Sequence, residues 1–176
     1  TTGVANCAFG GVYTGSTNAA LYNNTTGSYN NAFGIGALQA NTTGSNNTAV
    51  GYQAGYSNTT GAESVYIGQN AGYSATTNGQ NVFVGRYAGY STTGGYNCFI
   101  GYGAGNAVTS GTKNTILGAY TGNQGGLNIT TSSNYIVLSD GDGNPRAYWD
   151  NNGYQNLTAR QLTFAAGSGA NYIYAN

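Results

Sequence analysis

A short motif that returns at nearly constant spacing constrains this chain more than any other feature. Its clearest copy, Asn47–Gly55, reads Asn-Thr-Ala-Val-Gly-Tyr-Gln-Ala-Gly. From Gly34 onward, the first glycines of successive copies are 17, 17, 17, 16 and 17 residues apart. A period this regular and this short indicates a solenoid of short coils. The first glycines of the copies are Gly10, Gly34, Gly51, Gly68, Gly85, Gly101 and Gly118.

Each copy predicts one short strand before its first glycine. Because side chains alternate along a strand, we expect the residues one and three places before the glycine, such as Val84 and Val82, to fill the coil. The residue between them is apolar in every copy, which predicts a strand that is dry on both faces and covered outside by partner chains. The predicted subunit-interface residues are Ala32, Ala49, Tyr66, Phe83, Phe99 and Ile116.

Polar columns complete each coil. Asparagine four places before the glycine recurs in all copies but one, where Ser64 replaces it, and stacked asparagines can hydrogen-bond along a ladder. Turns of the type Asn-Thr-Thr-Gly, as at 41–44, close the other end of the coil. Cys7 and Cys98 share a strand column five copies apart, too far for a disulfide, and are predicted to be small buried hydrophobes.

The cores Asn-Thr-Ala-Val-Gly, Asn-Val-Phe-Val-Gly and Asn-Cys-Phe-Ile-Gly resemble the head repeat of trimeric autotransporter adhesins and related repeats in bacteriophage tail fibres. The resemblance covers about residues 6–123. It implies an all-β fold, a left-handed parallel β-roll in which three chains associate around an axis. The coils here are longer than the adhesin repeat, with the extra residues in the Asn-Thr-Thr-Gly turn, which favours the phage-type or environmental version over a bacterial adhesin head.

The period ends after Gly122, which predicts three parts. They are a β-solenoid with an irregular first coil over 1–123, a connector over 124–134 and a small C-terminal β module over 135–176. In the last part, an apolar run and a Gly/Asp/Pro-rich turn predict a β-hairpin. Its segment Ile136–Trp149 resembles the β element upstream of the self-cleaving chaperone in endosialidase-type tail proteins, which implies a phage-like or secreted fibre. Residues 157–176 predict two short strands or a swapped tail that joins subunits end to end.

The composition argues against several classes of function. Only 5% of the residues are charged and the net charge is zero, whereas nucleic acid requires clustered Lys and Arg. The chain has no His and only four carboxylates, so we expect no enzyme activity, no cofactor and no metal centre. We expect no membrane insertion, because no apolar run approaches the length of a span. The chain opens on Thr1 without Met or a signal pattern, which predicts a processed or partial product.

Two groups of residues have binding potential. Asp140, Asp142 and Asn144 resemble the start of a calcium loop, but Asn151 stands where the loop needs Glu, so a hairpin turn is the competing interpretation. Tyrosines follow the glycines in successive copies, as glycan contacts or as a self-supporting aromatic ladder. The candidate glycan contacts are Tyr56, Tyr73, Tyr90, Tyr52 and Tyr102.

The function predicted is therefore an extracellular structural and adhesive fibre, as in a virion tail or a secreted surface appendage. A homotrimer would present each contact to a cell-surface glycan or other receptor three times, by avidity. The alternatives are a subunit of an end-to-end filament and, with less support, a monomeric ice-binding solenoid. Thr43, Thr60, Thr77 and Thr93 recur once per coil, but in turns rather than in a Thr-x-Thr strand.

Overall fold

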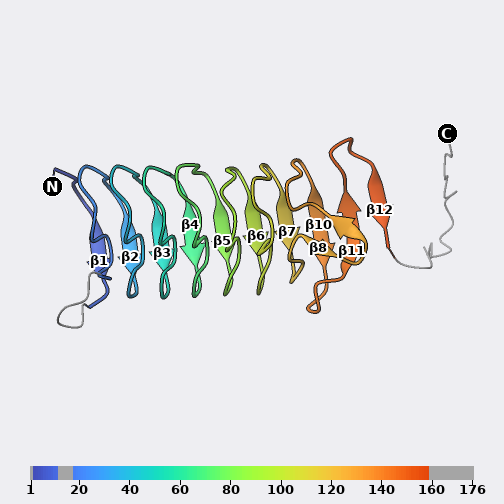
Figure 1. The fold of residues 1–176 in the computed structure, drawn as a ribbon, viewed down its shortest axis with the longest axis horizontal. Coiled ribbons are helices and arrows are strands. Elements are labelled where there is room, and N and C mark those ends of the chain that lie inside the picture. Colours follow the sequence, from blue (N-terminus) through green and yellow to red (C-terminus); the bar gives the residue numbers. More distant parts are fainter. Residues whose placement is uncertain (1, 12–17, 159–176) are drawn as a thin grey trace, which may run out of the picture.

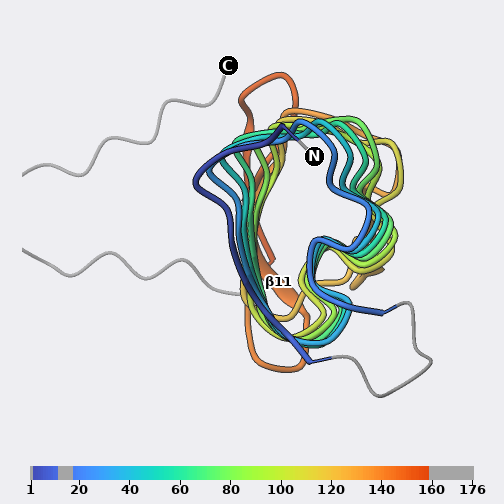
Figure 2. The same ribbon diagram turned by 90° about the vertical axis from the view of Figure 1, so that its left-hand side faces the viewer.

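The computed structural model describes residues 2–11 and 18–158, and within these ranges the fold is all-β with no helix. Coils of about 17 residues stack along one axis, each contributing one short strand to a continuous sheet (Figure 1). Viewed along this axis, successive coils superpose on one another as a flattened ring (Figure 2). The predicted parallel β-solenoid is confirmed.

Seven three-residue strands pair in parallel, each with the strand of the next coil. The register places equivalent residues opposite one another, as in Ala49 with Tyr66 and Tyr66 with Phe83. Every residue of a coil therefore has its own counterpart as its neighbour along the axis. The strands are β1 Cys7–Phe9, β2 Asn31–Phe33, β3 Thr48–Val50, β4 Val65–Ile67, β5 Val82–Val84, β6 Cys98–Ile100 and β7 Thr115–Leu117.

The same sheet continues into the C-terminal part of the described chain. Strand β10, Ile136–Ser139, pairs in parallel with β7 and occupies the place of the next coil's strand. The chain then reverses, because β11, Pro145–Trp149, and β12, Gln155–Leu157, follow in antiparallel order. Between β7 and β10, the short strands β8, Asn123–Gln124, and β9, Leu127–Asn128, form a separate two-stranded pair.

The structure reverses the predicted assignment of the two strand faces. From β2 to β7, the middle residue of each strand is buried inside its own coil, and the residues on either side of it point outward. The prediction that the middle residues meet partner chains is therefore wrong, since the chain itself covers them. The corrected residues are Ala32, Ala49, Tyr66, Phe83, Phe99 and Ile116, all with an exposed fraction of 0%.

The narrow interior explains why only one residue per strand points inward. Across the coil from the strand, the second glycine of the motif lies directly against the inward ring. A Cβ atom at Gly72 would lie 2.4 Å from the ring of Tyr66, and one at Gly89 would lie 2.6 Å from the ring of Phe83. The coil with the small Ala32 carries buried Leu38 at this glycine position. A large residue on the strand therefore faces glycine across the coil, and a small one shares its coil with a large residue, as close packing requires.

The predicted asparagine ladder is confirmed, and it is buried. The backbone N–H of Asn47 donates to Oδ1 of Asn30 at 3.0 Å, and the N–H of Ser64 donates to Oδ1 of Asn47 at 3.0 Å. Each Nδ2 turns to a carbonyl across the coil, as from Asn47 to Gly61 at 2.9 Å. One amide side chain therefore satisfies two backbone groups that the narrow coil removes from water. The buried ladder comprises Asn30, Asn47, Ser64, Asn81, Asn97 and Asn114.

The first glycine of the motif forms the corner where two coils come closest. Gly85 has a φ of +137°, and a Cβ atom there would lie 2.2 Å from the carbonyl oxygen of Gly101. Both the positive φ and the backbone contact exclude any other residue without a shift of the coil. Because the same contact recurs at each coil, the glycine column sets the stacking of the solenoid.

We predict that Gly85→Ala lowers the free energy of unfolding by about 3 kcal/mol or more, through strain at φ and the clash with Gly101. Thermal unfolding followed by circular dichroism measures the loss. Gly141→Ala is the matched control, because a Cβ atom there meets nothing within 4 Å. Equal stability of the two variants would contradict the close contact.

We predict that Asn97→Ala costs about 2–3 kcal/mol, because it leaves the N–H of Asn114 and the carbonyl of Gly111 buried without their partner. Asn97→Ser should cost less, since Ser64 accepts a hydrogen bond at the equivalent place. Chemical denaturation of both variants tests the order. Asn97→Ser proving as destabilising as Asn97→Ala would rule out the hydroxyl as a substitute acceptor.

Candidate binding surfaces

The outer face of the sheet is apolar along its length. Phe33 is 42% exposed, Ile67 39% and Leu117 51%. Threonine and valine of the neighbouring outward column lie beside them and are half-buried. We call this surface the sheet face and define it by Phe33, Val50, Ile67, Val84, Ile100, Leu117 and Leu138. A sheet that is apolar on both sides is normally covered on both, so the sheet face is a candidate interface.

Both cysteines belong to the outward column beside the sheet face. Cys7 is exposed on β1 and Cys98 is half-buried on β6, and both are free thiols. They share one column, separated by five strand steps, as the sequence predicted. The prediction that they are buried hydrophobes is wrong, because the strand faces are reversed. Partial burial raises the pKa of the Cys98 thiol, which keeps it protonated and unreactive near neutral pH.

The three tyrosines that follow the second glycine form the predicted ladder. The rings of Tyr56 and Tyr73 stack with centroids 5.1 Å apart and planes 2° from parallel. The rings of Tyr73 and Tyr90 stack at 5.1 Å and 12°. Their facing surfaces are thus in contact with one another, and the ladder offers ring edges and hydroxyl groups to solvent. This arrangement favours a self-supporting role for these three residues.

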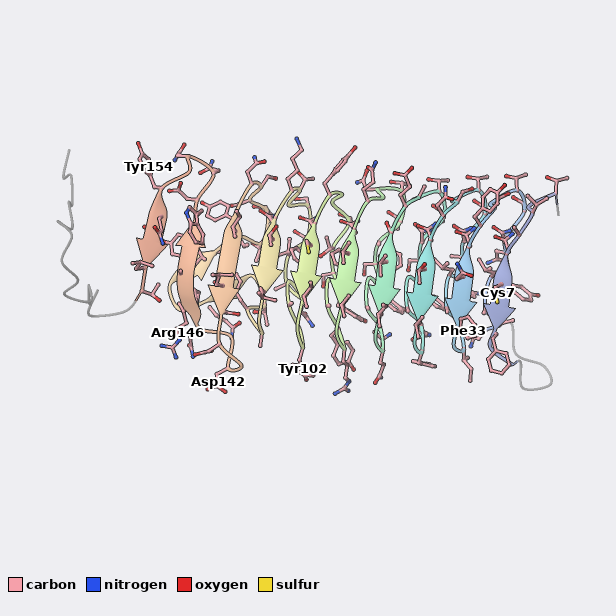
Figure 3. All side chains as sticks on the ribbon, turned by 180° about the vertical axis from the view of Figure 1, so that it is seen from behind. Cys7, Phe33, Tyr102, Asp142, Arg146 and Tyr154 are labelled. Atoms are coloured by element: carbon pink, nitrogen blue, oxygen red, sulfur yellow. The ribbon has the colours of Figure 1, made fainter. Side chains whose placement is uncertain are left out.

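A second tyrosine column lies at the corner after each strand and is open to solvent. Tyr52 is 49% exposed and Tyr102 63% exposed. Figure 3 shows Tyr102 projecting from the rim of the solenoid, beyond the end of its strand. Arg86 and Gln69 occupy the same column between them and are also exposed. We call this column, Tyr52, Gln69, Arg86 and Tyr102, the corner column.

The acidic turn between β10 and β11 uses its carboxylate within the protein. Oδ1 of Asp140 accepts the backbone N–H of Asn144 at 2.9 Å and that of Asp142 at 3.1 Å, while Oδ2 pairs with Arg146. The N–H of Asn144, followed by Arg146, lowers the pKa of Asp140 below its usual value. Figure 3 shows Arg146 and Asp142 at the same rim. The contacts of Asp140, Asp142 and Asn144 are those of a hairpin turn. In the described residues no three or more His, Cys, Asp or Glu side chains come together as a metal site would need.

Two buried tyrosine hydroxyls differ in their partners. Tyr120 donates to the carbonyl of Leu127 at 2.8 Å, and burial raises its pKa. The hydroxyl of Tyr66 has no hydrogen-bond partner within the described part of the chain. Burial raises the pKa of Tyr66 to about 12, and this effect exceeds the lowering of the pKa by the polar side chains of Ser64 and Asn81 nearby. The small Ser64 stands in the asparagine ladder of the same coil as this large side chain.

Other predicted features lie outside these surfaces. The two short strands or swapped tail predicted over 157–176 fall outside the described residues from position 159 onward. Across 2–11 and 18–158, the structure holds no helix long and apolar enough to cross a bilayer. The same ranges contain no pocket for a small molecule.

The sequence predicted neither the sheet face nor the contacts of Arg86 with Gln69 and Tyr87. The side chains of Val50, Ile67 and Ile100 are predicted to fill the interior, yet it is the middle column, from Ala32 to Tyr66 in size, that is matched across the coil. A column whose varying size is matched by Leu38 or glycine across the coil indicates an interior. This match in size across the coil could identify the inner strand face from the sequence alone. For Arg86, the sequence shows only its position in the corner column.

We predict that Tyr66→Phe is neutral or stabilising by about 1 kcal/mol, because it removes a buried hydroxyl without a partner. Tyr120→Phe, the matched control, should cost about 1 kcal/mol through loss of the bond to Leu127.

The pH dependence follows from the raised pKa: the stability contributed by neutral Tyr66 is present below pH 10, the usual tyrosine value, and is lost as pH rises toward 12. Denaturation at pH 8 and pH 11 measures both effects, and a steeper loss in Tyr66→Phe than in the parent would contradict them.

Comparison with protein-family models, with curated proteins and with solved structures found no match to this chain. No activity, ligand or partner is therefore carried over from a relative. The sheet face and the corner column are the surfaces on which a function can be argued.

Proposed function

We propose that this chain is a structural subunit of an extracellular adhesive fibre, in which three copies associate through their sheet faces. The observation that supports this most is the exposed apolar column from Phe33 to Leu138. Exposed apolar patches of this extent on proteins mark interaction sites. The fibre type, a phage-like tail fibre or a surface appendage, follows from the resemblance of the repeats alone.

The regular spacing of the sheet face favours copies of the same chain as its partner. Its side chains recur once per strand, at steps of about 4.8 Å. A second stack with the same rise matches this spacing along its whole length, whereas an irregular surface matches it at a few points. The resemblance to adhesin heads and tail fibres implies three chains and a left-handed roll. Closed association around an axis would leave the corner column of each chain available to a receptor.

The near absence of charge agrees with such a role. The chain has four basic and four acidic residues among 176, so its surface relies on Asn, Thr, Ser and Tyr for contact with water. A neutral sheet face brings no like charges together when identical chains meet. The electrostatic cost of self-association is therefore small.

Two other assemblies give different results in solution. Open-ended association would produce filaments of unlimited length, and an ice-binding solenoid would act as a monomer. For the latter, Thr42 and Thr59 already donate their hydroxyls to carbonyls of the next coil, at 3.0 and 3.2 Å. Thr93 occupies this same column, so it does not continue the exposed row of Thr43, Thr60 and Thr77.

We predict a trimer in solution, with three times the chain mass of 17.9 kDa. Light scattering on a sizing column measures this mass. The double variant Ile67→Lys/Ile100→Lys should be a folded monomer, because it places charges on the sheet face and leaves the coil interior intact. Thr60→Lys, on the exposed turn, should remain trimeric. A monomeric parent chain would contradict the proposal, as would a trimer that persists in the double variant.

A further inference from the structure

The corner column combines aromatic and cationic groups on a surface that is otherwise neutral and polar. Tyr52, Gln69, Arg86 and Tyr102 occupy equivalent places in four successive coils and are exposed. Their spacing along the axis is about 4.8 Å per coil. A linear ligand that lies along this corner would meet a ring, an amide, a guanidinium and a second ring in turn.

Arg86 is held in place from three directions. Its Nε donates to Oε1 of Gln69 at 3.1 Å, and its Nη2 donates to the hydroxyl of Tyr87 at 3.3 Å. Its Cζ lies 4.6 Å from the ring centroid of Tyr87 and 5.9 Å from that of Tyr102. Both distances are within the range of cation–π attraction. An exposed arginine normally samples many rotamers, so these contacts reduce the entropy that binding would cost.

The tyrosine ladder of Tyr56, Tyr73 and Tyr90 fixes the position of Tyr87, on which Arg86 rests. Tyr87 packs edge-on against Tyr90 with centroids 5.6 Å apart, and Tyr90 is the last ring of the stack that runs through Tyr73 to Tyr56. The guanidinium therefore rests on a series of rings that are fixed by one another. The ladder acts as a positioning element for Arg86 and does not need to contact a ligand itself.

The guanidinium retains both its charge and free donors. Two of its five N–H groups are used by Gln69 and Tyr87, which leaves three. Within the described residues the one ion pair joins Arg146 to Asp140, at the far end of the sheet. The carboxylate of Glu63 accepts from Gln80 at the opposite end of the strand, ahead of β4. No carboxylate of the described chain neutralises Arg86.

We propose that the corner column binds an acidic saccharide, with the carboxylate of a uronic-acid-type sugar on Arg86 and Gln69, and the ring of a neighbouring sugar against Tyr102. Guanidinium groups recognise carboxylates through paired N–H donors, and tyrosine supplies an apolar face with a polar tip. A single cation suits one carboxylate, whereas nucleic acid requires a cluster of cations. This inference names the receptor class of the fibre proposed above and rests on that function for its biological role.

Three chains in one assembly would present the site three times. An open surface with one charged contact gives weak binding per chain, and linked sites on a repeating polysaccharide convert weak contacts into strong attachment.

The experiment uses trigalacturonic acid as the acidic probe and its fully methyl-esterified form, which has the same backbone without charge, as the matched ligand. Isothermal titration calorimetry on the purified chain in low salt measures both affinities. We expect the acid to bind at least about tenfold more tightly than the ester, as loss of a charge-assisted hydrogen bond would produce. Added salt should reduce the difference.

Variants separate the site from general charge. Arg86→Gln should abolish the preference for the acid, while Lys113→Gln, which removes one positive charge from an exposed position ahead of β7, should retain it. Tyr102→Leu should weaken binding of both the acid and the ester, because it removes the ring that is proposed to contact the neighbouring sugar. Absence of acid binding, equal binding of acid and ester, or equal effects of the Arg86 and Lys113 variants would each overturn the proposal. The mass of the assembly is measured independently of ligand binding. A trimer that does not bind the acid would overturn the glycan site and leave the fibre proposal standing. A monomer that binds the acid would support the site and contradict the fibre proposal.

Discussion

The structure depends on one constraint: each residue stacks on its own counterpart in the next coil. A group in such a stack must interact favourably with a copy of itself or with a close substitute. Asparagine meets this condition because its Nδ2 donates to one copy while its Oδ1 accepts from another, as in Asn47 to Asn30 and Asn30 to Asn6, and aromatic rings meet it by stacking. Charged residues do not, since like charges would repeat at each step. The stacking of equivalent residues therefore accounts for the very low charge content of the coils.

Where the residue type in a stack changes, a buried polar atom loses its hydrogen-bond partner. A second asparagine column, Asn24, Asn41 and Asn58, hydrogen-bonds along the first coils and then meets Ala75. Oδ1 of Asn58 is left buried at that point, without a hydrogen-bond partner among the residues that the structure describes. Beyond Ala75 the column holds the buried Thr92, whose hydroxyl donates to the carbonyl of Val108 at 2.9 Å, and then the apolar Val108 and Ile129. The unsatisfied oxygen therefore lies where the run of asparagines ends at Ala75.

The sequence predicted the coil period, the asparagine ladder and the tyrosine stack, because each depends only on which residues recur. It did not predict which strand face is inside. A shift of one residue exchanges the two faces of a strand, and with apolar residues at all three positions, as in Val82–Val84, hydrophobicity cannot distinguish them. The deciding information lies across the coil, in the pairing of Tyr66 with Gly72 and of Ala32 with Leu38. The tyrosines of the candidate site were found from their recurrence, whereas the support of Arg86 by Gln69 and Tyr87 required the geometry.

The direction of the backbone hydrogen bonds has a mechanical consequence. In this solenoid the strands run across the long axis, so the bonds between coils lie along it (Figure 1). A pulling force applied along this axis passes through every coil-to-coil interface in series, so each interface bears the whole load. The resistance of a single chain to tension is then set by its weakest pair of coils. Lateral contacts between neighbouring chains would have to carry the load, by distributing it over many coils at once.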